Sequence, residues 1–89
     1  MARERPVRRL TVYTKNGCHL CEQAEDLLDD LRREAELRIT LIDITTDLAI
    51  YEHYKYEIPV VVVADGGTVS GRINLADLRR ALGLQDTLA

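Results

Sequence analysis

Cys18 and Cys21 are the only cysteines in the 89-residue chain, and they are separated by His19 and Leu20. A strand-like run over residues 10–13 precedes them and a helix-like run over residues 22–34 follows, a setting typical of a redox-active dithiol. A thiol at a helix N-terminus lies beside unpaired backbone N–H groups and the positive end of the dipole, which favour an anion. Such a setting lowers a cysteine pKa from about 8.5 to roughly 3.5–7.5, so we predict a reactive thiolate at Cys18. Cys21 follows one turn later on the same side, close enough to form a disulfide with Cys18.

Two other interpretations of the cysteine pair are less favoured. A closed zinc site normally needs four ligands, but the chain has no second cysteine pair, and His19 and His53 lack the spacing of a histidine pair. Cysteines also occur as small core residues. The polar loop Lys15-Asn16-Gly17 directly before the pair argues against that role. We therefore expect redox chemistry and no bound metal.

The composition is that of an ordinary globular domain, 46% hydrophobic and 30% charged. The length predicts one domain, residues 1–89, with a core over about 9–84 and flexible ends at 1–8 and 85–89. A net charge of −3 argues against a nucleic-acid partner. No apolar run approaches the ~20 residues of a membrane span, and the basic N-terminus lacks the features of a secretory signal. We therefore expect a cytoplasmic protein, where a cysteine pair is more often catalytic or metal-binding than structural.

The first half of the chain predicts a β-α-β unit. Residues 9–14 alternate as a strand, and Gly17 allows the turn into the following helix. Small and aliphatic residues at three- and four-residue steps define the apolar face of that helix. They are Leu20, Ala24, Leu27, Leu28, Leu31 and Ala35. Acidic residues occupy the other face of the helix, where they would be solvated. If Glu22 and Glu25 instead point toward Cys18, their negative charges would oppose formation of its thiolate. A second strand over 37–44 should run parallel to the first.

The second half predicts a short helix, a hairpin and a last helix. Asp47 is a candidate cap for a helix over residues 48–54. The apolar run 60–64 predicts a central strand, and the turn at 65–67 joins it to an antiparallel strand over 68–73. Asn74 then begins a last helix, which ends at Gly83. The order β-α-β-α-β-β-α fits an α/β fold in which a mixed four-stranded sheet has helices on both faces.

Several segments together resemble a known family. Tyr13-Thr14-Lys15 precedes the cysteine pair, Asp43-Ile44 closes the second strand, Ile58-Pro59 opens the third, and Asp65-Gly66 marks the hairpin. Gly71-Arg72-Ile73, followed by Asp77-Leu78, occupies the stretch that is Gly-Gly-x-x-Asp-Asp-Leu in many glutaredoxins. The arrangement resembles a minimal thioredoxin fold and, more narrowly, the glutaredoxin-like proteins, over about residues 10–83.

The resemblance implies roles for residues around the cysteines. Pro59 would be a cis-proline facing the disulfide, with the Ile58 backbone free to pair with an extended thiol substrate. Without the resemblance, the residue favours a proline that starts a strand. Lys15 would lie near the thiolate and contact a glutathione carboxylate, or would be a solvated loop residue. A protonated His19 would favour the Cys18 thiolate unless it points outward.

The remaining residues of the predicted substrate site depart from the family pattern. Gly71 matches the first glycine of the Gly-Gly pair, but Arg72 replaces the second, and Glu57 precedes Ile58 where glutathione-binding members have Thr-Val-Pro. A carboxylate at Glu57 would repel the glutathione carboxylates, whereas Arg72 would attract one. His19-Leu20 likewise replaces the usual Pro-Tyr or Gly-Pro.

The sequence therefore predicts a glutaredoxin-like dithiol–disulfide oxidoreductase. Cys18 and Cys21 would be catalytic, and the substrate would be a protein disulfide or a glutathione mixed disulfide. We expect a monomer with no bound cofactor, with glutathione as a possible co-substrate and a thiol reductant or reductase as electron donor. Two other functions stay open: a carrier of an Fe–S cluster or metal through Cys18, and a redox-silent module that binds a partner at the Pro59 edge.

Overall fold

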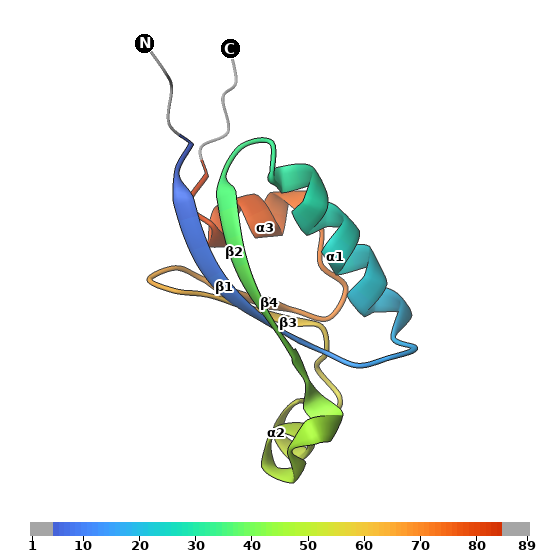
Figure 1. The fold of residues 1–89 in the computed structure, drawn as a ribbon. Coiled ribbons are helices and arrows are strands. Elements are labelled where there is room, and N and C mark those ends of the chain that lie inside the picture. The colour runs from blue at the N-terminus through green and yellow to red at the C-terminus, as the bar shows by residue number, and fades with distance from the viewer. Residues whose placement is uncertain (1–4, 85–89) are drawn as a thin grey trace.

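The computed structural model describes residues 5–84 (Figure 1). The elements in chain order are β1 (Val7–Thr14), α1 (His19–Leu31), β2 (Glu36–Asp43), the 3₁₀ turn η1 (Ile44–Thr46), α2 (Leu48–Tyr54), β3 (Val60–Val63), β4 (Thr68–Ser70) and α3 (Leu75–Ala81). The expected order β-α-β-α-β-β-α is thereby confirmed. The predicted flexible segments 1–4 and 85–89 lie outside the described residues.

The four strands form one mixed sheet in the order β2-β1-β3-β4. β1 pairs with β2 in parallel over its whole length, from Val7 opposite Glu36 to Thr14 opposite Asp43. The other two pairings, β1 with β3 and β3 with β4, are antiparallel. Helix α1 supplies the crossover that a parallel pair requires. The predicted mixed four-stranded sheet is therefore confirmed, with its first two strands parallel and its hairpin antiparallel.

Helices α1 and α3 share one core on one face of the sheet (Figure 1). Alternation along β1 directs Leu10 and Val12 to that face, where they pack with Leu28 of α1 and Leu78 of α3. The remaining core residues are Leu31, Ala35, Leu37, Val61, Val63, Ala81 and Leu82. Leucine and valine alone thus fill most of a core that contains neither Phe nor Trp.

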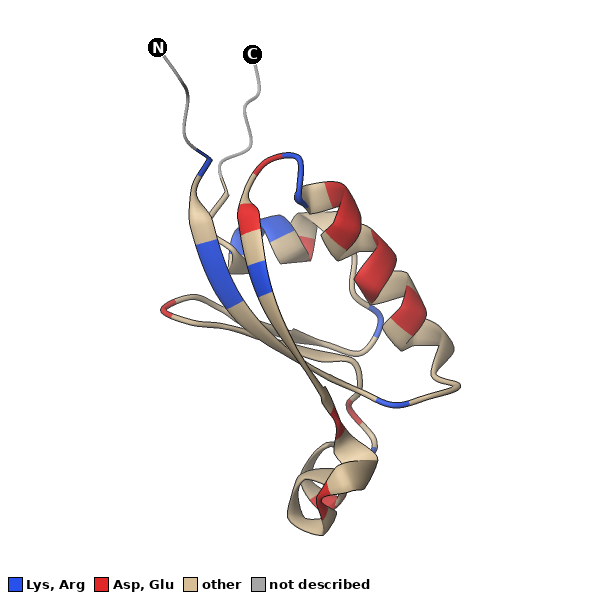
Figure 2. Cartoon of the chain, in the orientation of Figure 1, with Lys and Arg blue, Asp and Glu red and all other residues tan. Residues whose placement is uncertain are grey.

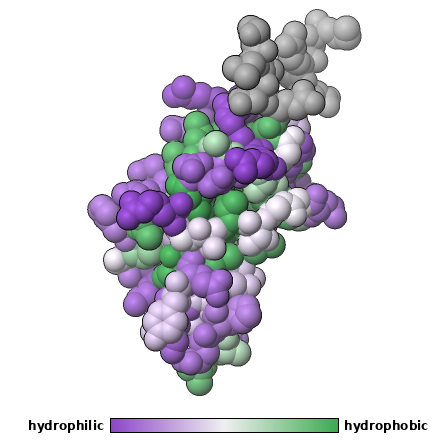
Figure 3. All heavy atoms as spheres, turned by 180° about the vertical axis from the view of Figure 1, so that it is seen from behind, coloured by the Kyte–Doolittle hydropathy of each residue, from purple (hydrophilic) through white to green (hydrophobic). Residues whose placement is uncertain are grey.

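Helix α2 contacts the opposite face through Tyr54, the last residue of the helix. The Tyr54 ring stacks on Tyr13, which alternation directs away from the core, with ring centroids 4.3 Å apart. No residue of α2 is buried, and the lobe that it forms is mostly hydrophilic when the molecule is seen from behind (Figure 3). Helices therefore lie on both sides of the sheet as predicted, but the middle of the second face is left open.

The ends of several elements differ from the sequence prediction. β1 begins at Val7, two residues before the expected start, so part of the predicted flexible segment 1–8 belongs to the sheet. Arg8 fixes this end, because its Nε donates a hydrogen bond of 2.6 Å to the carbonyl of Leu82. Helix α1 begins at His19 and ends at Leu31, three residues earlier at each end than expected. β4 ends at Ser70, before Gly71, whose φ of +72° interrupts the extended backbone.

The β3–β4 hairpin packs tightly against α3. The Gly67 N–H donates a hydrogen bond of 3.0 Å to the carbonyl oxygen of Ala81. A Cβ atom placed on Gly66 would lie 2.6 Å from that same oxygen, so only glycine fits without displacing the backbone. The turn chemistry that predicts a hairpin at this position therefore also sets the approach of the last helix.

We predict that Leu28→Ala lowers the free energy of unfolding by about 2–5 kcal/mol, because it leaves a cavity where α1 meets the sheet. The wild-type side chain is 1% exposed. Leu48→Ala on α2 makes the same chemical change at a side chain that is 76% exposed, and we expect a change within about 0.5 kcal/mol. Urea unfolding followed by circular dichroism measures both variants. Equal losses of stability would contradict the placement of the core.

Candidate functional site

Cys18 and Cys21 meet at the start of α1. Cys18 is the N-cap, with φ −92° and ψ 108°, and its sulfur accepts a hydrogen bond of 3.2 Å from the Cys21 backbone N–H. The two residues form a disulfide with their Cα atoms 5.2 Å apart. Cys18 is half-buried, whereas Cys21 is only 1% exposed. The first sulfur is thus the accessible member of the pair and lies at the positively polarised end of the helix.

The loop between β1 and α1 positions Cys18. The Cys18 N–H donates a hydrogen bond of 3.3 Å to the Lys15 carbonyl, which closes a turn over residues 15–18. Gly17 has a φ of +77°, a conformation that favours glycine, as the sequence predicted. Lys15 and His19 are both exposed at this end of the molecule. Within residues 5–84, no hydrogen bond or ion pair joins either side chain to the cysteines.

The Ile58–Pro59 peptide bond is cis, as the resemblance implied. The Pro59 ring is buried and its carbonyl accepts a hydrogen bond of 2.9 Å from the Gly71 N–H, which also lies 3.1 Å from the Glu57 carbonyl. Within the described residues, neither the N–H nor the C=O of Ile58 takes part in a backbone hydrogen bond. Ile58 therefore presents a free main-chain edge next to Pro59.

The strand register brings these residues to the same end of the sheet as the cysteines. Tyr13 of β1 lies opposite Val60 of β3, and Val60 lies opposite Ser70 of β4. Pro59 and Gly71 therefore follow at the end where β1 leads into the Cys18 loop. Arg72 is exposed just beyond Gly71. The predicted site residues thus come from the β1–α1 loop, the segment before β3 and the segment after β4. All three segments lie at one pole of the molecule.

A cavity of about 390 Å³ lies beside the buried cysteine. It lies between the Lys15 loop, the first turns of α1 and the end of β2. Its lining comprises Thr14, Lys15, Asn16, Gly17, Cys21, Glu22, Glu25, Leu41 and Asp43. Glu22 and Glu25, the two acids whose orientation the sequence left open, both belong to it, and further acids continue along α1 (Figure 2). This cavity was not predicted from the sequence.

Asp43 caps the turn that follows β2. Its Oδ1 accepts hydrogen bonds of 2.9 Å from the Thr45 N–H and 2.6 Å from the Thr45 hydroxyl. These bonds, with a smaller contribution from the positive charge of Lys15, lower the pKa of the Asp43 carboxyl below its ordinary 3.8. The signal in the sequence was an Asp followed two residues later by Thr, a pattern typical of such side-chain caps.

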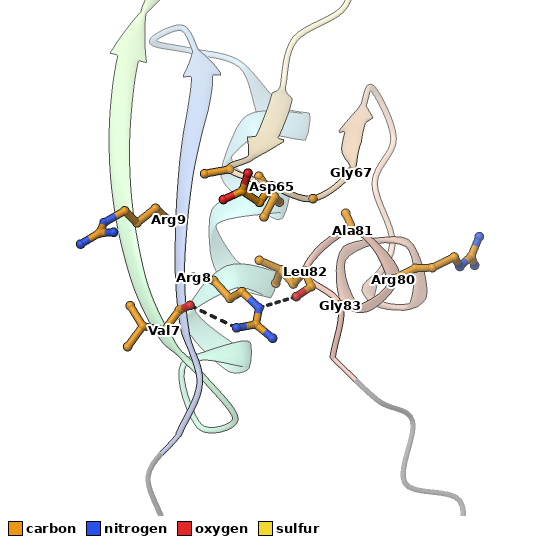
Figure 4. A pocket seen from close by; sticks show the side chains of 12 residues that line it. Val7, Arg8, Arg9, Asp65, Gly67, Arg80, Ala81, Leu82 and Gly83 are labelled. Atoms are coloured by element: carbon orange, nitrogen blue, oxygen red, sulfur yellow. Dashed lines mark hydrogen bonds between the residues drawn. The ribbon is translucent and has the colours of Figure 1, made fainter.

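A second cavity, of about 430 Å³, lies at the opposite end of β1 (Figure 4). Arginines line it, but Arg8 is committed to the carbonyls of Leu82 and Val7, and Arg9 and Arg80 point away from each other. The positive charges thus do not converge on one ligand. This cavity is remote from the cysteines and is not part of the candidate site.

Among residues 5–84, no three His, Cys, Asp or Glu side chains are arranged so that together they could hold a metal ion. No helix among residues 5–84 is both long and apolar enough to cross a membrane.

The sheet order, the disulfide at the start of α1 and the cis-proline at the same pole define a thioredoxin-like redox fold. The family model of the Glutaredoxin-like domain (DUF836) matches residues 9–83, and the chain belongs to this family.

Two solved structures share the fold. The X-ray structure of target protein XcR50 from X. campestris is 30% identical with a TM-score of 0.67, and the match covers 79% of this chain and 89% of that one. The solution NMR structure of protein Ne2328 from Nitrosomonas europaea is 28% identical with a TM-score of 0.60, and covers 73% and 76% of the two chains.

We predict that Thr45→Val raises the pKa of the Asp43 carboxyl toward 3.8, because the hydroxyl hydrogen bond is lost. A depressed native pKa contributes stability that is complete above the unfolded value and is lost as the pH falls through the native value. The variant should therefore lose less stability on acidification through this range. NMR titration of the carboxyl carbon measures the shift. Thr46→Val is the control, because the Thr46 hydroxyl binds the Asp43 carbonyl instead, and an equal shift there would contradict the assignment.

Proposed function

We propose that this protein is a dithiol–disulfide oxidoreductase that reduces protein disulfides or glutathione mixed disulfides. The observation that carries the proposal is the Cys18 sulfur as the N-cap of α1, where it accepts the Cys21 N–H and is paired with the Cys21 sulfur. A sulfur in this position is stabilised as the thiolate by the backbone amides and the helix dipole. Membership of a glutaredoxin-like family supports the same chemistry.

In the first step the Cys18 thiolate attacks one sulfur of the substrate disulfide. A Cys18–substrate disulfide forms, the substrate S–S bond breaks, and the other substrate sulfur leaves as a thiolate that takes a proton from solvent. The half-buried Cys18 carries out this step because the substrate reaches it first. Cys21, at 1% exposure, stays out of reach of an external disulfide.

In the second step the Cys21 sulfur attacks the Cys18 sulfur. The Cys18–Cys21 disulfide forms, the mixed disulfide breaks, and the second substrate sulfur leaves reduced. Two electrons have then passed from the dithiol to the substrate. The short separation of the two Cα atoms, 5.2 Å, suits this intramolecular closure.

The Ile58 backbone is the proposed docking edge for the substrate. Its N–H and C=O have no backbone partner among residues 5–84, and the adjoining Pro59 carbonyl is held by Gly71. An extended substrate segment would satisfy both free groups by pairing as a short strand at the pole that carries Cys18. Main-chain pairing of this kind is tolerant of sequence, which suits a protein-disulfide substrate.

The electron donor is either glutathione or a thioredoxin-type reductase. Exposed cations at Lys15 and Arg72 favour glutathione, whose two carboxylates they would attract, whereas the carboxylate of Glu57 opposes it. Turnover with glutathione plus glutathione reductase, compared with turnover with thioredoxin reductase, distinguishes the two donors. Activity with neither, together with visible absorbance after anaerobic purification, would instead point to the Fe–S carrier.

We predict that Cys18→Ser abolishes insulin-disulfide reduction, because the attacking sulfur is lost. Cys21→Ser should still form a Cys18–substrate disulfide but should not release it, so the adduct accumulates. Mass spectrometry of the acid-quenched reaction detects the adduct. Full activity of Cys18→Ser, or an adduct on Cys21 in the wild-type protein, would overturn the proposed order of attack.

We predict that Arg72→Ala raises the KM for a glutathione mixed disulfide by up to about fivefold, the effect of losing one exposed charge contact of about 1 kcal/mol. The kcat should stay unchanged because the guanidinium would contact a carboxylate of glutathione and not the reacting sulfurs. Arg33→Ala removes an exposed arginine just beyond α1 and is the matched control. An identical KM for both variants would remove Arg72 from the glutathione contacts.

A further inference from the structure

The acid-lined cavity beside Cys21 has no role in the steps described so far. It reaches the buried cysteine between α1 and β2, and it contains carboxylates from both elements. An adjoining pocket of about 200 Å³, which shares Glu25 and Leu41 with it, continues along α1 toward Asp29 and Arg32. Solvent thus has a route to the neighbourhood of Cys21 that does not pass Cys18.

The second step of the proposed reaction needs a proton acceptor at Cys21. The thiolate is the attacking form of a cysteine, and burial in an apolar setting disfavours the charged form of a thiol. Cys21 is almost wholly buried, and its own N–H is directed to the Cys18 sulfur. Because the thiol must lose a proton before it attacks, a base that faces the cavity would speed the step.

Four charged side chains face the cavity near Cys21: Lys15 from the loop, Glu22 and Glu25 from α1, and Asp43 from the end of β2. Lys15 is a cation and accepts no proton. Asp43 is a weak base, because the Thr45 hydrogen bonds stabilise its charged form and lower its pKa. Glu22 directly follows Cys21 in α1, so its side chain points to a different side of the helix.

Glu25 is placed differently from the other three. It lies four residues after Cys21, so the two side chains lie on the same face of α1 with Cβ atoms about 5–6 Å apart. The Glu25 side chain is half-buried, and within residues 5–84 its carboxylate takes part in no hydrogen bond or ion pair. It is thus a free carboxylate on the same cavity as the thiol, within reach directly or through one water molecule.

We propose that Glu25 accepts the proton of the Cys21 thiol when Cys21 attacks the mixed disulfide. This inference rests on the proposed function. As the Cys21 S–H bond breaks, the proton passes to the Glu25 carboxylate and the Cys21 sulfur bonds to Cys18. The substrate sulfur leaves as a thiolate, and the proton on Glu25 then returns to solvent or to the leaving thiolate.

The test follows the lifetime of the Cys18–glutathione adduct after the reduced protein is mixed with glutathione disulfide. Glu25→Gln should prolong the adduct by about tenfold or more at neutral pH, because general-base assistance is lost. The difference should shrink as the pH rises, since hydroxide then removes the proton. Asp26→Asn is the matched control: it removes one negative charge from an exposed position one residue away that does not line the cavity.

The outcomes separate this inference from the proposed function. An adduct lifetime in Glu25→Gln equal to that of the wild type, or an equal effect in Asp26→Asn, would overturn the role of Glu25 while the redox activity stood. Absence of any adduct or turnover in the wild type would contradict the proposed function itself.

A titration without substrate tests the Glu25–Cys21 contact independently of turnover. In Cys18→Ser protein, ultraviolet absorbance reports ionisation of the Cys21 thiol. Glu25→Gln should lower the pKa of that thiol, because a neighbouring negative charge disfavours the thiolate. Asp26→Asn should shift it less. An unchanged Cys21 pKa in Glu25→Gln would contradict the contact.

Discussion

The hydrogen bond from the Cys21 amide to the Cys18 sulfur is the interaction on which the rest of the site depends. It gives one atom two tasks, because the same sulfur caps α1 and carries the proposed chemistry. Side-chain caps contribute about 0.5–2 kcal/mol, and an anionic acceptor strengthens the bond. Reduction to a thiolate would therefore tighten the start of the helix. The fold holds the reactive state at little conformational cost, since the cap exists already in the disulfide.

The sheet surrounds this helix start with two unlike environments. On one side the β3 and β4 connections bring Ile58, Pro59 and Gly71 together as main-chain groups, which suit an extended peptide of any sequence. On the other side lie carboxylates and a lysine around a cavity. The proposed substrate edge and the proposed proton acceptor thereby come from different elements around the start of α1. Lys15 belongs to both environments, because it lines the cavity and also lies among the cations proposed to attract glutathione.

Most of the fold followed from the sequence, because its local signals agree with one another. The period of leucines in α1, the apolar run of β3, the Asn74 cap and Gly83 each predict an element that the structure contains. The boundaries of α1 were predicted less well. The helix-like run was predicted over residues 22–34, whereas α1 begins at His19 with Cys18 as its N-cap.

The site was predictable where chemistry is tied to one residue type and not where it arises from packing. The two cysteines and Pro59 were found from spacing and resemblance. The cavity was not, because it forms only when the parallel register sets the end of β2 beside the first turns of α1. The small part played by α2 was equally hidden, since a capping residue predicts a helix and not how much of it is buried.

The link between Arg8 and the Leu82 carbonyl joins the first strand to the end of the last helix at the pole away from the thiols. Residues 5 and 84, the first and last that the structure describes, therefore lie toward that pole (Figure 1). A purification tag, a fluorophore or a fused domain attached on either side should leave the face around Cys18 unobstructed. The molecule is therefore suited to immobilisation through this pole, with the Cys18 sulfur on the side away from the support.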